Sequence, residues 1–158
     1  MTAETSAFLQ ALVAEAETVQ QFVDLLKLEQ TDLSSGKTND LPAFAEKKAT
    51  LAAHLNRFAT RRNTALAAQG FDADRAGVEA WCANHSGVQE AVDAWSRIIS
   101  LAGEARELNR LNGELIRTRM HYNARALEAL QGGKTSLDLY GPDGQSKSSG
   151  IRRINDAV

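Results

Sequence analysis

One cysteine and one nearby histidine are the first side chains in the sequence that could do chemistry. Cys82 and His85 form a single C-x-x-H spacing, and the chain contains no other cysteine. A structural zinc site needs about four ligands, and the other two histidines, His54 and His121, do not lie at ligand spacing. A thiol nucleophile needs a base that a third group orients, and this spacing supplies none. We therefore predict no catalytic residue, no metal site and no cofactor. An enzyme that uses Cys82 stays as the third alternative, after the two functions given below.

Short motifs and overall charge argue against several other functions. The sequence lacks G-x-x-x-x-G-K-[ST], G-x-G-x-x-G and H-E-x-x-H, so phosphate-binding loops and zinc hydrolases have no support. The net charge of −2 gives no general attraction to nucleic acid or anionic lipid. Two arginine pairs, at 61–62 and 152–153, are more simply explained as solvated helix-end or tail charges. We predict no nucleic-acid partner and no stable membrane insertion.

The composition is typical of a helical domain in a reducing compartment. Hydrophobic residues make up 43% of the 158 residues, which is enough for the core of one domain. A single cysteine cannot form an internal disulfide. The N-terminal MTAETSAFLQ lacks the basic and apolar regions of a signal peptide, and no apolar run reaches the roughly 20 residues of a membrane span. We expect a cytoplasmic location.

Three long amphipathic helices are predicted, with a short helix before the third. Their expected ranges are 5–33, 40–70, 72–82 and 86–130. In each long helix the apolar residues recur mainly at spacings of three, four or seven and form one stripe, although Glu15 and Glu29 interrupt the first. The residues expected to start or stop these helices are Thr5 or Ser6, Asp40 with Pro42, Gly70, Asp72, and Ser86 with Gln89.

The third helix is predicted to be longer than its neighbours. At 1.5 Å per residue it would reach about 65–70 Å, against roughly 45 Å for each of the first two. Its stripe therefore needs a further partner: a second copy, the short helix or a client protein. We predict an all-α fold, an elongated antiparallel bundle or coiled coil of three long helices with a short extra helix. This helical domain would cover residues 1–131, and a flexible C-terminal tail, rich in Gly, Ser, Asp and Lys, would cover 132–158.

Residues 108–130, LNRLNGELIRTRMHYNARALEAL, mix polar residues into an apolar helix face. Asn109 and Asn112 lie three apart on that face, and Asn123 lies two heptads beyond Asn109. Two interpretations stay open: a buried polar layer that fixes helix register, or a partly polar seam that a removable partner covers. Gly113 costs about 1 kcal/mol relative to Ala in a helix interior, and close approach of another helix would explain it.

Three aromatic residues outside that stretch also bear on the prediction. Trp81 and Trp95 lie at otherwise apolar positions and are expected in the core. Tyr140, within LYGPDGQ (139–145), stands among turn-forming residues. It is interpreted either as an anchor for a partner's pocket or as part of a simple Pro-Asp-Gly turn.

Two motifs, in this order after two helices, resemble the FlgN family. The first is L-N-x-x-N-G-x-L-I, carried by Leu108, Asn109, Asn112, Gly113, Leu115 and Ile116, and followed by Asn123, Ala126, Leu127 and Leu130. The second is L-Y-G-x-D-G-Q, carried by Leu139, Tyr140, Gly141, Asp143, Gly144 and Gln145. The second predicted helix is also similar, through Glu46, Lys47, Leu51, Leu55 and Arg61 or Arg62.

The resemblance implies a non-enzymatic cytoplasmic chaperone of flagellar type III export. Such a chaperone holds the terminal helices of hook-associated proteins one and three, prevents their premature assembly and delivers them to the flagellar export gate. The expected client-binding residues are Leu108, Asn109, Leu111, Asn112, Gly113, Leu115, Ile116, Asn123, Leu127 and Leu130. The expected gate-docking residues are Leu139, Tyr140 and Gly141. The alternative is a structural coiled-coil protein that dimerises through its long helix, so a homodimer is an open expectation.

Overall fold

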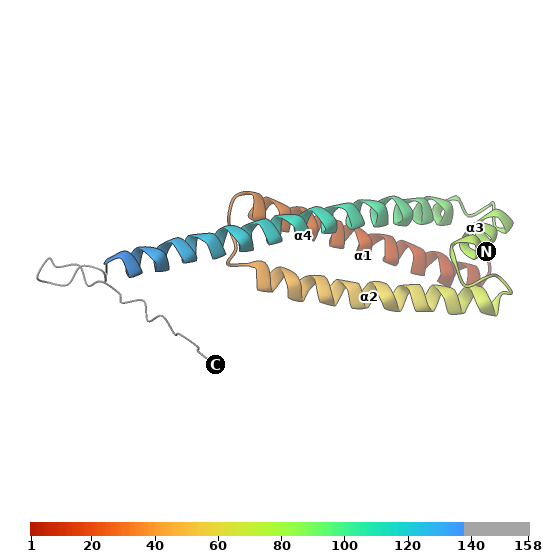
Figure 1. Ribbon diagram of the computed structural model, residues 1–158. Helices are drawn as coiled ribbons and strands as arrows, with labels where there is room; N and C mark the ends of the chain where they lie inside the picture. The colour runs from red at the N-terminus through yellow and green to blue at the C-terminus, as the bar shows by residue number, and fades with distance from the viewer. Residues whose placement is uncertain (138–158) are drawn as a thin grey trace, which may run out of the picture. The chain divides into compact units, whose positions relative to one another are not determined.

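The chain consists of four helices in the part that the structure describes. The computed structural model describes the backbone of residues 1–137 and the side chains of residues 1–132. Its helices are α1 (Ala3–Ser34), α2 (Leu41–Ala68), α3 (Arg75–Asn84) and α4 (Gln89–Leu137) (Figure 1). No strand occurs in residues 1–137, and none of the described helices is long and apolar enough to cross a bilayer. The predicted all-α fold of three long helices and a short one is confirmed.

The chain divides into two compact units, Met1–Ile116 and Arg117–Val158, and α4 contributes residues to both. The first unit holds α1, α2, α3 and the beginning of α4. Its helix bounds differ from the predicted ones at several capping residues. Thr2 rather than Thr5 or Ser6 caps α1, because its hydroxyl accepts a hydrogen bond from the Thr5 N–H at 3.2 Å. Pro42 lies in the first turn of α2, as expected.

The boundaries of α3 and α4 also differ from the expectation. Asp74, not Asp72, caps α3 by accepting a hydrogen bond from the Gly77 N–H at 2.9 Å. The helix α4 begins at Gln89, so Ser86 and Gln89 do not form the predicted capping box. At its other end α4 continues to Leu137 rather than stopping near Leu130. A glycine in a helix costs about 1 kcal/mol, and the pair at 132–133 does not stop this helix.

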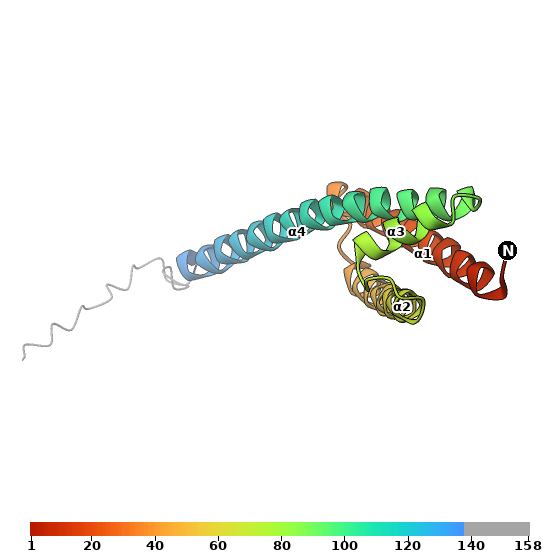
Figure 2. The same ribbon diagram turned by 90° about the vertical axis from the view of Figure 1, so that its right-hand side faces the viewer.

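Two glycines are required by the backbone around α3. Gly70 follows the end of α2 with φ of 79°, a left-handed conformation that residues with a side chain rarely adopt. At Gly77 an added Cβ would lie 1.7 Å from the Asp72 carbonyl oxygen. These positions fold the chain back so that α3 crosses between the end of α2 and α4, as Figure 2 shows.

The larger of the two buried clusters in the first unit includes residues of α3. Trp81 is completely buried, packs against Phe8 in a tilted arrangement with ring centroids 4.4 Å apart, and donates a hydrogen bond to Gln69 Oε1 at 2.8 Å. Trp95 lies in the same cluster, so the prediction that both tryptophans are core residues is confirmed. A second cluster follows along the bundle, with Val19, Val23, Leu26, Leu101 and Ala105.

Polar contacts between the long helices show their relative directions. The Lys27 ammonium lies 2.7 Å from Glu104, and Arg97 donates to Gln20 at 3.4 Å. Both pairs join α1 to α4 and are 77 residues apart, so these helices are parallel and in register over this stretch. The helix α2 is antiparallel to α1. Glu15, early in α1, pairs with Arg62, late in α2, whereas Glu29, late in α1, pairs with Lys48, early in α2.

Those two glutamates, which interrupt the apolar stripe of α1, are the centres of buried polar contacts. Glu29 is 1% exposed, and its two carboxylate oxygens lie 3.0 and 2.8 Å from the Lys48 ammonium. The Asn112 amide of α4 donates to the Glu29 carboxylate and to the Leu26 carbonyl oxygen, each at 2.9 Å. We call this group of Glu29, Lys48 and Asn112 the polar node. It joins α1, α2 and α4.

The second buried glutamate has an equivalent arrangement near the other end of the bundle. Glu15 accepts a hydrogen bond from Arg62 of α2. The Arg62 guanidinium in turn lies over the Trp95 ring of α4, 5.1 Å from its centroid, at a distance suited to a cation–π interaction. A buried carboxylate of α1 is thus paired with a cation of α2 and completed by a residue of α4 at both places.

Removing the cation of the polar node should be costly. Lys48→Met keeps the apolar stem but leaves the Glu29 carboxylate buried without its counter-ion. We expect the free energy of unfolding to fall by about 3 kcal/mol, measured by urea denaturation followed by circular dichroism. The exposed neighbour Lys47→Met is the control and should change it by less than about 0.5 kcal/mol. Equal effects of the two substitutions would contradict the role given to the node.

Candidate functional site

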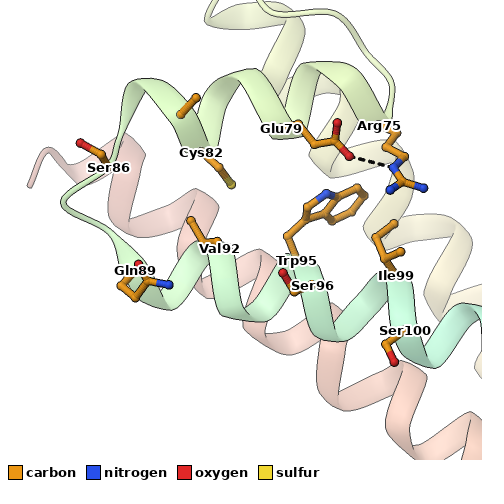
Figure 3. A pocket seen from close by; sticks show the side chains of 11 residues that line it. Arg75, Glu79, Cys82, Ser86, Gln89, Val92, Trp95, Ser96, Ile99 and Ser100 are labelled. Carbon is orange, nitrogen blue, oxygen red and sulfur yellow. Dashed lines mark hydrogen bonds and ion pairs between the residues drawn. The ribbon is translucent and has the colours of Figure 1, made fainter.

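A recess between α3 and α4 is the first candidate site (Figure 3). Its volume is about 670 Å³. Val92, Trp95 and Ile99 line the α4 side, and the Trp95 indole stands up toward α3. Arg75 donates a hydrogen bond to Glu79 at 2.8 Å on the α3 side. The recess therefore offers mainly apolar packing surface with one ion pair at its edge.

The thiol of this recess is not arranged for nucleophilic chemistry. Burial, and secondly the charge of Glu79, raise the pKa of Cys82 above its ordinary value, which keeps the thiol protonated at neutral pH. The His85 ring stacks on Trp81 with centroids 4.2 Å apart, and its Nδ1 lies 2.8 Å from the Trp81 carbonyl oxygen. His85 thus completes the end of α3 instead of acting on Cys82. Among the described residues no group of three or more His, Cys, Asp or Glu side chains could hold a metal ion.

A groove between α1 and α2 is the second candidate. It also has a volume of about 670 Å³, and its apolar lining includes Leu25, Leu28 and Leu51. Asp24 and Glu46 add acidic groups to the lining. Leu28 is 61% exposed, which makes it a useful reference for an exposed leucine outside the predicted client-binding region.

The predicted client-binding residues of the first unit do not share one exposed face. Asn109 is exposed, whereas Asn112 is 1% exposed and donates hydrogen bonds to Leu26 and Glu29 of α1. For Asn112 the structure favours the register interpretation, and its amide cannot meet a client while α1 and α4 stay packed. Gly113 has no neighbouring atom within 4 Å of an added Cβ, so close approach of another helix does not explain it in the described structure. Half-buried positions are occupied by Leu108, Leu111, Gly113, Leu115 and Ile116.

The described part of the second unit presents its predicted residues to solvent. Every residue from Met120 to Gly132 is exposed. Leu127 is 58% and Leu130 70% exposed, and Asn123 is exposed between them and Met120. Met120, itself 67% exposed, was absent from the prediction. Its spacing of three before Asn123 and seven before Leu127 would have identified it as a member of the same stripe.

The predicted gate-docking residues, Leu139, Tyr140 and Gly141, lie outside the described residues. The division into a helical domain (1–131) and a tail (132–158) also stays a prediction. The helical backbone continues to Leu137, past the predicted boundary.

Comparison with known proteins gives consistent matches. The family model described as FlgN protein matches residues 1–148. The Flagella synthesis protein FlgN of Yersinia enterocolitica is 35% identical over 69 residues, which are 44% of this chain and 46% of that protein. The matched region thus spans less than half the length of this curated relative. No solved structure matches the chain.

The two neighbouring asparagines should behave differently on substitution. Asn112→Leu removes both hydrogen bonds to α1 and leaves Glu29 with one donor fewer, so the free energy of unfolding should fall by about 2 kcal/mol. Asn109→Leu changes an exposed side chain and should alter it by less than about 0.5 kcal/mol. Urea denaturation of both single variants tests this, and a larger loss for Asn109→Leu would contradict the assignment of Asn112 to the core.

Proposed function

Because this chain belongs to the FlgN family, we propose that it is a cytoplasmic chaperone of flagellar type III export. Its clients would be hook-associated proteins one and three. The observation that carries the proposal is the row of large apolar side chains, Met120, Leu127 and Leu130, that α4 exposes within the family match. A soluble chain gains nothing from such a row unless another surface covers it.

Helix capture is the mechanism that this surface supports. A client's amphipathic terminal helix would lay its apolar face along α4, as helices do in grooves and coiled coils. Burying one large aliphatic side chain stabilises a complex by about 1.5–3 kcal/mol, and the cost of association offsets part of this gain. Three such anchors fit reversible binding, which a chaperone needs because the client must leave at the export gate. A captured helix is also unable to pair with another hook-associated protein. This mechanism requires no cofactor and no reaction.

The C-terminal residues would provide the second contact. We assign docking on the export gate to Leu139, Tyr140 and Gly141, by resemblance to the family's L-Y-G-x-D-G-Q motif. The described stripe and the proposed gate contact then use different residues, so a client and the gate could be bound together.

A structural dimer remains the competing function, because the same stripe could pair two copies of α4. The mass of the protein in solution, with and without the C-terminal segment of a client, separates the two. A dimer whose mass does not change when the client segment is added favours the structural protein. Formation of a complex with the client segment, with loss of any dimer, favours the chaperone.

The leucines of the stripe should carry client affinity. Leu127→Glu together with Leu130→Glu should weaken the binding of hook-associated proteins one and three by about thirtyfold or more, corresponding to roughly 2 kcal/mol. Both side chains are exposed, so the circular dichroism spectrum should not change. Leu28→Glu, at a leucine of α1 with similar exposure, is the matched control and should keep full affinity in calorimetry. If the control loses as much affinity as the double variant, the client lies elsewhere.

Substitution of Tyr140 should impair docking on the export gate without impairing client binding. Tyr140→Ala should leave client affinity unchanged in calorimetry, reduce recovery of the export gate in a pull-down by about thirtyfold, and lower motility. Tyr122→Ala is the control, because Tyr122 is also exposed but lies off the stripe. Loss of client binding with intact gate binding would show that the two partners are assigned to the wrong segments.

A further inference from the structure

The exposed part of α4 carries side chains at heptad spacing. Met120, Asn123, Leu127 and Leu130 follow one another at intervals of three, four and three residues, and all four are exposed. A repeat of about 3.5 residues keeps a stripe facing one partner helix along its length. A single α-helix, packed side by side with α4, is therefore the shape that fits this surface.

Basic residues outnumber acidic residues in the sequence around this stripe. Between residues 117 and 132 the sequence has three arginines, Arg117, Arg119 and Arg125, and one acidic residue, Glu128. At 100° per residue, Arg117 and Arg119 fall on opposite sides of the stripe beside Met120, whereas Arg125 falls on the reverse face of the helix. A helix lying on the stripe would thus pass between two cationic side chains at one end.

The other end of the stripe has a different border. Ala124 and Ala126 occupy the two flanking positions beside Leu127, where they add no charge and leave room for large apolar side chains of a partner. The selectivity for charge is therefore concentrated next to Met120.

Asn123 interrupts the apolar stripe between Met120 and Leu127. When a partner helix covers it, its amide leaves water and needs a hydrogen-bonding group opposite. A single Asn among core positions of a coiled coil selects the register in which polar residues meet, at a cost in stability. Asn123 would reject a helix whose face is uniformly apolar or whose polar residue lies at another level.

Resting on the proposed function, we propose that the stripe selects an acidic amphipathic client helix. This helix has Asp or Glu at the positions that face Arg117 and Arg119, and one polar residue in its apolar face opposite Asn123. A second copy of the chain fits less well, because its own three arginines would add to the positive charge already present.

Designed peptides of about three heptads provide a direct test with the full chain. The first peptide has Leu at its core positions, Asn at the central one and Glu at the flanking positions. The second is identical but has Lys at the flanking positions. The Glu peptide should bind roughly tenfold more tightly in fluorescence anisotropy at low salt, and the difference should shrink in concentrated salt.

Charge reversal within α4 identifies the residues responsible. Arg117→Glu with Arg119→Glu should reverse the preference, so that the Lys peptide binds better. Arg125→Glu makes the same change of charge on the reverse face and should keep the preference for the Glu peptide. Circular dichroism and a urea transition of each variant establish that it is folded before binding is measured.

A third peptide tests the register. It has the composition of the Glu peptide, but its Asn is moved to a terminal core position. The intact chain should bind this peptide several-fold more weakly than the centred one, by analogy with the selection of register in coiled coils. In Asn123→Leu that difference should disappear.

Three results would overturn the proposal. The first is equal affinity for the Glu and Lys peptides, and the second is an unchanged preference in the Arg117→Glu, Arg119→Glu variant. The third is a dimer, detected by sedimentation, that neither peptide dissociates and that Leu127→Glu disrupts, since a second copy would then occupy the stripe. Failure of the proposed function gives another pattern: the peptides are discriminated as expected, but neither hook-associated protein binds the chain. If those proteins bind while the peptides are not discriminated, the proposed function stands and the inferred selectivity is wrong.

Discussion

The buried carboxylate of Glu29 is the constraint on which the arrangement of the long helices depends. A charge that is 1% exposed must be paired and hydrogen-bonded, because desolvation without partners costs several kcal/mol. Lys48 and Asn112 meet this requirement from two different helices. A shift of α2 or α4 by one turn would remove a partner from Glu29. The node therefore discriminates against other registers more strongly than the non-directional apolar contacts around it.

The contact between Glu15 and Arg62 extends the same constraint along the bundle. Glu15 and Glu29 are separated by four turns of α1, and Lys48 and Arg62 are separated equally on α2 in reverse order. Only an antiparallel hairpin in one register satisfies both pairs. Trp95 and Asn112 then attach α4 to each pair, and its parallel direction relative to α1 follows because α3 carries the chain across the end of the bundle.

These constraints end where the candidate client surface begins. The node fixes α4 at Asn112, and the side chains from Met120 to Gly132 are exposed. The backbone of this exposed stretch is already helical, so a partner helix would not have to order it. Such preorganisation lowers the conformational cost of binding, and it fits a chaperone that takes up and releases clients repeatedly.

The sequence by itself determined the four helices, their approximate ends and the excess length of the last one, because apolar periodicity and helix-breaking residues are local properties. Through the resemblance to a family it also predicted Asn123, Leu127 and Leu130 as client-binding residues, and the structure shows that their side chains are exposed. The sequence did not distinguish Asn109 from Asn112, which differ only in what lies opposite them: solvent for one and α1 for the other. Nor did it explain Glu15 and Glu29, which interrupt the stripe until Arg62 and Lys48 are brought against them. Only the tertiary structure decided these roles, because the partner of a buried polar group lies on another helix, far away in the chain.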